Sequence, residues 1–252
     1  MKLITIKNCT IGSGMPKICL PIVGTTEEEI CRQAQSFSGY HCDLAEWRVD
    51  WFAGLDDLTQ LEHAARALRA VLPDTPILFT FRTKEEGGER AISDEDYRAL
   101  NYFAARSGLI DLLDVELFRG DDTVRDIISF AHECGVAVVV SNHNFTETPP
   151  QEEILSRLQK AQALGADILK IAVMPQSPRD VLTLLSATEE AHRLCDRPLI
   201  TMSMGPLGAV SRVAGETFGS AVTFGAAGKA SAPGQIAADD LYRILSVMHS
   251  GE

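Results

Sequence analysis

Lys170 occupies a position in this sequence that is hard to explain without chemistry. It lies inside the apolar run from Asp167 to Val173, whereas the other lysines lie outside such runs. Burial is unusual for lysine because desolvation penalises its charge. An amine kept from water, with the cations Arg48 and Arg82 close by, is expected to be uncharged and able to attack a ketone carbon. The pattern therefore predicts a Schiff base at Lys170, whose iminium would act as an electron sink.

His143 is the candidate base that such a site needs, because an iminium makes the protons on the adjacent carbon acidic. It follows the preceding apolar run in Ser141-Asn142-His143-Asn144, and imidazole titrates near neutral pH. Glu86, in the loop sequence Lys84-Glu85-Glu86-Gly87-Gly88, is the candidate for orienting the imidazole ring. Taken alone, the neighbouring acidic residues Glu85 and Glu86 are more typical of a solvated turn.

More polar residues fall late in successive apolar runs, on one shared face. Side chains alternate along a β-strand, so residues two apart point the same way. The pairs that this rule places together are Glu46 with Arg48, Thr80 with Arg82, Asp114 with Glu116, and Ser141 with His143. Unpaired buried charge is costly, so this concentration of ionisable groups favours a reaction site. The alternative is a structural ion-pair layer of Lys170, Glu46 and Glu116.

Arg212, in Ser211-Arg212, is the candidate for holding an anionic group of a substrate. A planar guanidinium binds a carboxylate through two parallel hydrogen bonds. The alternative is an arginine at a helix end on the surface. The small-residue segment 225–235 that follows is a candidate lid over the site.

The elements that must position these residues alternate between predicted strands and predicted helices. The strands are residues 18–23, 43–49, 76–81, 110–117, 136–141, 167–173, 198–203 and 220–224, and the helices include 26–37, 58–71, 94–107, 152–164 and 178–194. This alternation predicts one (β/α)8-barrel domain over residues 1–252, with a hairpin before Ile18 closing the barrel floor. An open doubly wound sheet is the alternative, but Val23-Gly24-Thr25-Thr26 stands where its Gly-rich turn is expected.

Composition narrows the possible functions. The chain is 45% hydrophobic and 23% charged, which is typical of a globular protein, and its net charge of -12 disfavours nucleic acid and membrane surfaces as partners. No stretch of about 18 apolar residues occurs, and the apolar run at the start of the sequence is too short for a signal peptide. We therefore expect a cytoplasmic protein. The six cysteines lack a C-x-x-C or Cys/His ligand spacing, so we interpret them as buried, reduced thiols without a metal.

Several segments together resemble the type I 3-dehydroquinate dehydratase family. The matching segments are Glu46-Trp47-Arg48-Val49-Asp50, Phe79-Thr80-Phe81-Arg82, Glu86-Gly87-Gly88, Ser141-Asn142-His143, Lys170-Ile171-Ala172, Ser211-Arg212 and Ala230-Ser231-Ala232-Pro233-Gly234-Gln235. They span nearly the whole chain and fall in the family's order. The resemblance implies a (β/α)8 homodimer of the shikimate pathway that makes 3-dehydroshikimate from 3-dehydroquinate by syn elimination of water, without metal or organic cofactor.

The resemblance also implies a role for each matching residue. Lys170 would form the Schiff base, His143 would move the C2 proton and protonate the departing C1 hydroxyl, and Glu86 would pair with the imidazole. The implied substrate-binding residues are Glu46, Arg48 and Arg82 for the ring hydroxyls, Arg212 for the carboxylate, and Ser231 and Gln235 on the lid. Pro21 is a departure, because some relatives carry a serine there that touches the substrate.

Two other functions fit parts of the pattern. A class I aldolase would share the barrel and the lysine, and would place a phosphate site near the last two strands, for which Gly225-Ala226-Ala227-Gly228 is a candidate. A catalytically silent ligand-binding barrel would keep the fold alone. Binding by itself would not need an amine, a base and an orienting carboxylate together, so the intact Lys170, His143 and Glu86 favour an enzyme.

Overall fold

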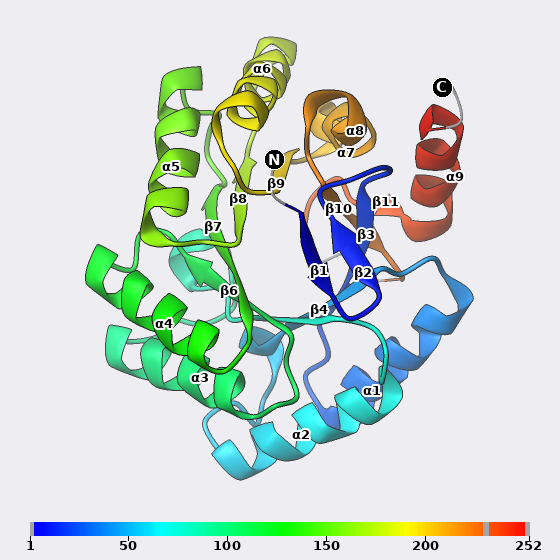
Figure 1. Ribbon diagram of the computed structural model, residues 1–252. Coiled ribbons are helices and arrows are strands. Elements are labelled where there is room, and N and C mark those ends of the chain that lie inside the picture. Colours follow the sequence, from blue (N-terminus) through cyan, green and yellow to red (C-terminus); the bar gives the residue numbers. More distant parts are fainter. Residues whose placement is uncertain (1–2, 229–231, 250–252) are drawn as a thin grey trace.

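A parallel β-sheet rolled into a barrel forms the centre of the molecule, and helices surround it (Figure 1). The structure is a computed structural model, which describes residues 3–228 and 232–249. The barrel strands are β3 (Lys17–Ile22), β4 (Leu44–Arg48), β5 (Ile77–Thr80), β6 (Leu112–Glu116), β7 (Ala137–Asn144), β8 (Ile168–Val173), β9 (Leu199–Ser203) and β10 (Val222–Ala226). The helices are α1 (Glu27–Ser36), α2 (Leu58–Val71), α3 (Asp94–Arg106), α4 (Asp121–Glu133), α5 (Gln151–Leu164), α6 (Pro178–Leu194), α7 (Ala209–Val213), α8 (Gly215–Phe218) and α9 (Ala238–His249).

The barrel closes between β9 and β10. Strands β3 to β9 pair in chain order, and β10 pairs with β3 on its other side. At the remaining seam, Ala221 N donates to Leu199 O at 2.7 Å, and Leu199 also forms a parallel bridge with Ser220. A short strand β11 (Ile236–Ala237) adds to β10 just before α9. The predicted (β/α)8 barrel is therefore confirmed, and the open doubly wound sheet is excluded.

Local sequence explains where the helices begin. The hydroxyl of Thr26 accepts from Glu29 N at the start of α1, and the carboxylate of Asp57 accepts from Thr59 N at the start of α2. At α6, Ser177 and Asp180 form a capping box. Each cap satisfies backbone donors that would otherwise lack a partner at the helix start.

An N-terminal hairpin covers the barrel end at which the strands begin. Strands β1 (Ile4–Ile6) and β2 (Cys9–Ile11) pair antiparallel across a turn at Lys7, whose φ is 52°. Figure 1 shows this hairpin lying across the barrel opening. Ile11 packs with inward residues of the strands, including Leu44 and Leu112, in one buried apolar cluster. The hairpin is thus the predicted floor of the barrel. The site expected from the sequence lies at the opposite end, where the strands end.

Two expectations about these elements were wrong in detail. The strand predicted to end at Ser141 continues to Asn144, because Asn142, His143 and Asn144 stay paired with β8. The cysteines are all free, but only Cys9, Cys19 and Cys195 are buried as expected. Cys31 and Cys42 are partly exposed, and Cys134 is exposed because it lies at the end of α4 on the surface. Within the part of the chain described, no helix combines the length and apolarity needed to cross a bilayer.

Candidate active site

Strand alternation turns Lys170 into the barrel. Its neighbours Leu169 and Ile171 belong to the apolar layer between the sheet and the helices, whereas Ile168 and Ala172 belong to the cluster inside the barrel. Lys170 shares the parity of this second pair, and only 5% of its surface is exposed. The predicted buried lysine therefore points to the interior near the carboxyl end of β8.

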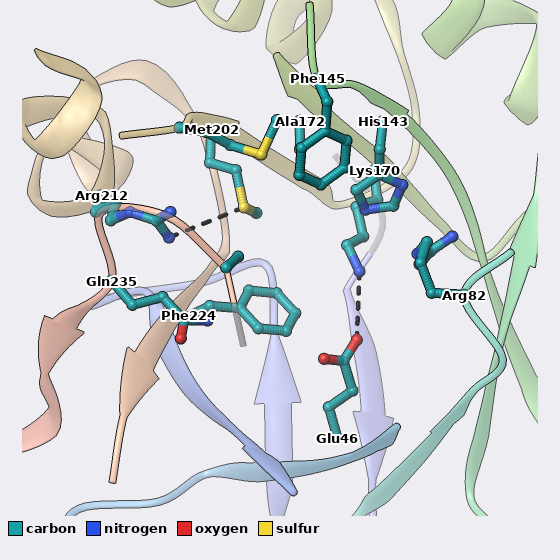
Figure 2. Close-up of a pocket in the computed structure, with 12 residues that line it drawn as sticks. Glu46, Arg82, His143, Phe145, Lys170, Ala172, Met202, Arg212, Phe224 and Gln235 are labelled. Carbon is teal, nitrogen blue, oxygen red and sulfur yellow. Dashed lines mark hydrogen bonds and ion pairs between the residues drawn. The ribbon is translucent and has the colours of Figure 1, made fainter. Parts of the chain in front are cut away.

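Two carboxylates contact the amine of Lys170. Its Nζ donates to Asp114 Oδ2 at 2.9 Å and lies 3.5 Å from Glu46 Oε1 (Figure 2). The Nζ also lies 4.8 Å from the centre of the Phe224 ring. Carboxylates and an aromatic face stabilise an ammonium ion. The expectation of an uncharged amine took only Arg48 and Arg82 into account, and Asp114 was not predicted as a neighbour of Lys170.

Arg82 links one of these carboxylates, Asp114, to Glu116 in a buried network. Its Nη2 donates to Asp114 Oδ1 at 2.6 Å, and its Nη1 donates to Glu116 Oε1 at 2.9 Å and to Ser141 Oγ at 3.1 Å. Burial alone would raise the pKa of Asp114, but Arg82 and Lys170 outweigh it and hold that pKa well below its ordinary value. An ion-pair layer thus exists, although Glu116 pairs with Arg82 and not with Lys170.

His143 and Glu86 form the expected pair at the edge of this network. Glu86 Oε2 accepts from His143 Nδ1 at 2.8 Å and from His143 N at 2.9 Å. Burial, together with the cations Arg82 and Lys170, lowers the pKa of His143 well below its ordinary value, so the ring is neutral at neutral pH. Burial also raises the pKa of Glu86 to about 7, against the opposing effect of Arg82. With Nδ1 bound to Glu86, Nε2 is the nitrogen left to accept a proton.

A cavity that is open to solvent lies beside Lys170 and His143. Its lining combines charged side chains with sulfur-containing and aromatic ones. The lining residues are Glu46, Arg82, His143, Phe145, Lys170, Ala172, Met202, Met204, Arg212, Phe224, Ala232 and Gln235. Figure 2 shows Arg212 and Gln235 across the cavity from His143 and Arg82. An anionic group held by Arg212 would thus place the rest of a small molecule over the amine.

Arg212 is buried but only partly satisfied. It belongs to α7, its Nη2 donates to Pro233 O at 3.0 Å, and its Nη1 lies 4.0 Å from Met202 Sδ. Its Nε has no hydrogen-bond partner, and within residues 3–228 and 232–249 no carboxylate lies within ion-pair distance of its guanidinium. Burial lowers the pKa of Arg212 to about 10. The helix-end surface arginine is therefore excluded, and the group is suited to receive an anion.

The remaining predicted residues have different surroundings. Arg48 is not among the cavity-lining residues, and its Nε and Nη2 donate to the two oxygens of Asp50 at 2.8 and 2.7 Å. Ser231 lies outside the described residues. Pro21 is buried in β3 opposite Glu46, on the same face as the inward Cys19.

Sequence reasoning missed the partner of Lys170 and much of the apolar wall. Asp114 was placed on the inner face by parity, but nothing in the pattern said which cation it would meet. Met202, Met204 and Phe224 also end inward on their strands, and the same parity rule identifies them once the strand ends are known. Across the described ranges, no cluster of three or more His, Cys, Asp or Glu side chains is arranged to hold a metal ion.

Known proteins resemble this chain along its whole length. The family model for type I 3-dehydroquinase matches residues 18–252. The 3-dehydroquinate dehydratases of Listeria welshimeri and Salmonella agona are 53% and 51% identical, and each alignment covers 99% of both chains. A solved type I 3-dehydroquinate dehydratase from Clostridium difficile, crystallised with covalently modified comenic acid, is 47% identical with a TM-score of 0.96 and covers 100% of this chain and 99% of that one. The 3-dehydroquinate dehydratase structure from Geobacillus kaustophilus is 44% identical with a TM-score of 0.97, over 100% and 98%. The site and these likenesses agree: the chain belongs to the type I 3-dehydroquinase family.

Proposed function

We propose that this protein is a 3-dehydroquinate dehydratase of the shikimate pathway, a hydro-lyase that converts 3-dehydroquinate into 3-dehydroshikimate through a Schiff base at Lys170. Family membership and the names of the full-length relatives support the reaction. One observation carries the mechanism: the buried amine of Lys170 and the neutral ring of His143 line one cavity, opposite an arginine without a carboxylate partner among the described residues.

Schiff-base formation begins with attack of Lys170 Nζ on the ring ketone. The amine gives up its proton before the attack, and the carbonyl oxygen leaves as water, so that an iminium replaces the ammonium ion. Asp114 and Glu46 then lie next to the iminium, which carries the same charge at the same position as the ammonium ion that it replaces. The environment is therefore organised before the reaction and needs little rearrangement when the covalent cation forms.

Elimination of water follows from the iminium. His143 removes the C2 proton, and the electron pair moves into the iminium to give an enamine. The enamine expels the C1 hydroxyl, which takes the proton back from His143 and leaves as water. Hydrolysis of the iminium then frees 3-dehydroshikimate and Lys170. In this scheme Glu86 keeps the imidazole oriented through Nδ1, and no step uses a metal ion or an organic cofactor.

Substrate binding is divided between the two sides of the cavity. We assign the carboxylate to Arg212 and the ring hydroxyls to Glu46 and Arg82. Gln235 lines the cavity near Arg212 and is proposed to bind the same end of the substrate. The predicted contacts of Arg48 and Ser231 with the substrate stay predictions. Arg48 is paired with Asp50 in the structure.

Borohydride trapping tests the covalent step. Incubation of the protein with 3-dehydroquinate and borohydride should add the mass of the reduced adduct to Lys170. Lys170→Ala should abolish this mass, whereas His143→Ala should still trap substrate but lose turnover, followed by enone absorbance. Lys160→Ala is the matched control, because Lys160 is a surface lysine paired with Asp121 and should not change trapping.

Three outcomes of this experiment would contradict the proposal. Trapping that survives Lys170→Ala would place the chemistry elsewhere. Binding without any added mass would indicate a silent ligand-binding barrel. Cleavage of sugar phosphates, with no enone formed from 3-dehydroquinate, would indicate a class I aldolase.

We also propose that residues 1–252 act as one catalytic domain, in a cytoplasmic homodimer. The full-length match to relatives of nearly the same extent supports a single domain. The dimer follows from the family resemblance, and the location is the one expected from the sequence. Light scattering coupled to gel filtration should give twice the chain mass of 27.4 kDa, and a monomer would contradict this part of the proposal.

A further inference from the structure

Glu86 is held by donors from two consecutive residues of β7. Its Oε2 accepts from the Nδ1 and backbone N of His143, and its Oε1 accepts from Asn142 Nδ2 at 3.0 Å. Asn142 is 5% exposed and has opposite strand parity to His143, so it belongs to the helix-facing side of β7. Both oxygens of the Glu86 carboxylate are therefore hydrogen-bonded. Oε2 is bound by the inward-facing His143, and Oε1 is bound by the helix-facing Asn142.

The side-chain amide of Asn142 has only one orientation that satisfies both of its partners. Arg157 Nη1 donates to Asn142 Oδ1 at 2.8 Å. A guanidinium can only donate, so the amide oxygen must face Arg157, and this leaves the amide nitrogen to donate to the Glu86 carboxylate. Exchanging the two amide atoms would place donor against donor and acceptor against acceptor. Arg157 thus decides that Glu86 receives a hydrogen bond from this amide.

Contacts near the surface hold Arg157 in place. It belongs to α5, where its Nε donates to Glu153 Oε1 at 2.8 Å, and its guanidinium lies 5.5 Å from the centre of the Phe118 ring. Its side chain is 19% exposed. A continuous series of contacts therefore runs from the outer helix layer, through Arg157, Asn142 and Glu86, to the ring of His143.

We propose that Asn142 and Arg157 are positioning residues for His143, which act by fixing the Glu86 carboxylate that orients the imidazole. This inference rests on the proposed function, in which His143 moves the proton. Without the amide donor, Glu86 Oε1 loses its side-chain partner, and the carboxylate is held only through Oε2, by His143 and by Arg82 Nη1 at 3.7 Å. Its orientation toward Nδ1 is then less firmly fixed. The ring then loses its fixed tautomer and the direction of Nε2, although Lys170 and the substrate-binding side chains are untouched.

Asn142→Asp tests the donor, because it keeps the shape of the side chain and replaces the amide nitrogen with an acceptor. We expect kcat to fall about 10- to 100-fold, as misplaced catalytic groups typically cause, with KM unchanged and borohydride trapping of the imine retained. The ¹⁵N NMR signals of His143, recorded without substrate, should lose the pattern of a single Nδ1–H tautomer. Asn144→Asp is the matched control on the same strand, because Asn144 Oδ1 only accepts, from Thr146 N and Glu147 N. It should leave kcat and the His143 signals as they are.

Arg157→Gln tests the second residue of the Asn142–Arg157 pair, the one on α5, with a milder change. It should lower kcat in the same direction but by less, and it should add nothing to the loss once Asn142→Asp is present, since both act through one carboxylate. Glu153→Gln is its control, because it removes the negative charge beside Arg157 but keeps an acceptor oxygen for Nε and leaves the contact with Asn142. This control should keep full activity.

Each readout can also overturn the inference. An unchanged kcat in both variants, a loss confined to KM or to trapping, or additive losses in the double variant would show that the pair does not act through Glu86. If Asn142→Asp does not fold, Arg157→Gln and its NMR spectrum still decide the question. The NMR measurement needs no substrate, so it tests this pair even if the protein fails to dehydrate 3-dehydroquinate.

Discussion

The two sides of the cavity treat charge in opposite ways. On the side of β4 to β8, Arg82 and Lys170 are each paired with buried carboxylates at hydrogen-bond distance. On the side of β9 and β10, Arg212 is also buried, but among the residues that the structure describes its guanidinium has only Pro233 O and a methionine sulfur as partners. One side is electrostatically complete before any ligand arrives, and the other is not.

This difference separates organising the reaction from capturing the substrate. A paired network holds its geometry, so the amine and the imidazole are in place at the start. An unpaired buried cation is costly to the empty protein, and an incoming carboxylate relieves that cost. If the two sides differ in this way, removing an arginine from each should change stability with opposite signs.

Arg82→Met should cause the largest loss of stability. The substitution leaves Asp114 and Glu116 buried without their arginine, and breaking one partner out of a buried ion pair typically costs about 3–5 kcal/mol. The free energy of unfolding, from urea titration at pH 7, should fall by about that amount. Arg66→Met is the control, because Arg66 makes an exposed pair with Glu62 on α2, and pairs of that kind contribute little. Equal, small losses in both variants would mean that the buried network adds no stability.

Arg212→Met should instead stabilise the empty protein while weakening substrate binding. Removing a buried and incompletely paired cation should raise the free energy of unfolding by about 1 kcal/mol. Loss of the carboxylate partner should raise KM for 3-dehydroquinate about 100-fold, with a smaller effect on kcat. The same protein preparations should be used for urea titration and steady-state kinetics, so that both effects are measured together.

Arg212→Lys separates charge from shape in this prediction. Lysine keeps the positive charge but cannot make two parallel hydrogen bonds to a carboxylate, so KM should lie between those of the wild type and Arg212→Met. A loss of stability in Arg212→Met as large as that in Arg82→Met would contradict the comparison. It would show that Arg212 is a structural residue of the same kind as Arg82.

The order of elements could be predicted from sequence, because apolar periodicity is local. The helices over residues 58–71 and 178–194 have the predicted bounds, and all eight predicted strands are present. The errors arose where pairing with a distant strand overrides local composition. Residues 142–144 are too polar to look like a strand, yet their hydrogen bonds to β8 keep them extended. Between β9 and β10 the chain forms the short helices α7 and α8, for which no bounds were predicted.

The site could be predicted as a set of inward residues but not as a set of partners. A lysine in an apolar strand and a histidine after its neighbour are visible in the sequence, and both line the cavity. Which carboxylate meets Lys170 depends on how β6 and β8 sit across β7, and that register is not local. The neighbours predicted for the amine were incomplete for the same reason, because Asp114 was not assigned to it.

Pro21→Ser should have the smallest effect and tests the boundary between the two sides. Pro21 lies in β3, between β10 and β4, opposite Glu46 and on the inner face. Proline offers no hydrogen-bond donor, whereas a serine hydroxyl there could bond to a substrate hydroxyl. One such bond contributes about 0.5–1.5 kcal/mol, so KM should fall by about two- to tenfold at most. Pro21→Ala is the matched control, because it opens the same space and restores the same backbone N–H without adding a hydroxyl. A KM that falls in Pro21→Ser but not in Pro21→Ala would show that β3 can contribute a polar contact with the substrate. Equal KM values in both variants would show that this position only shapes the cavity wall.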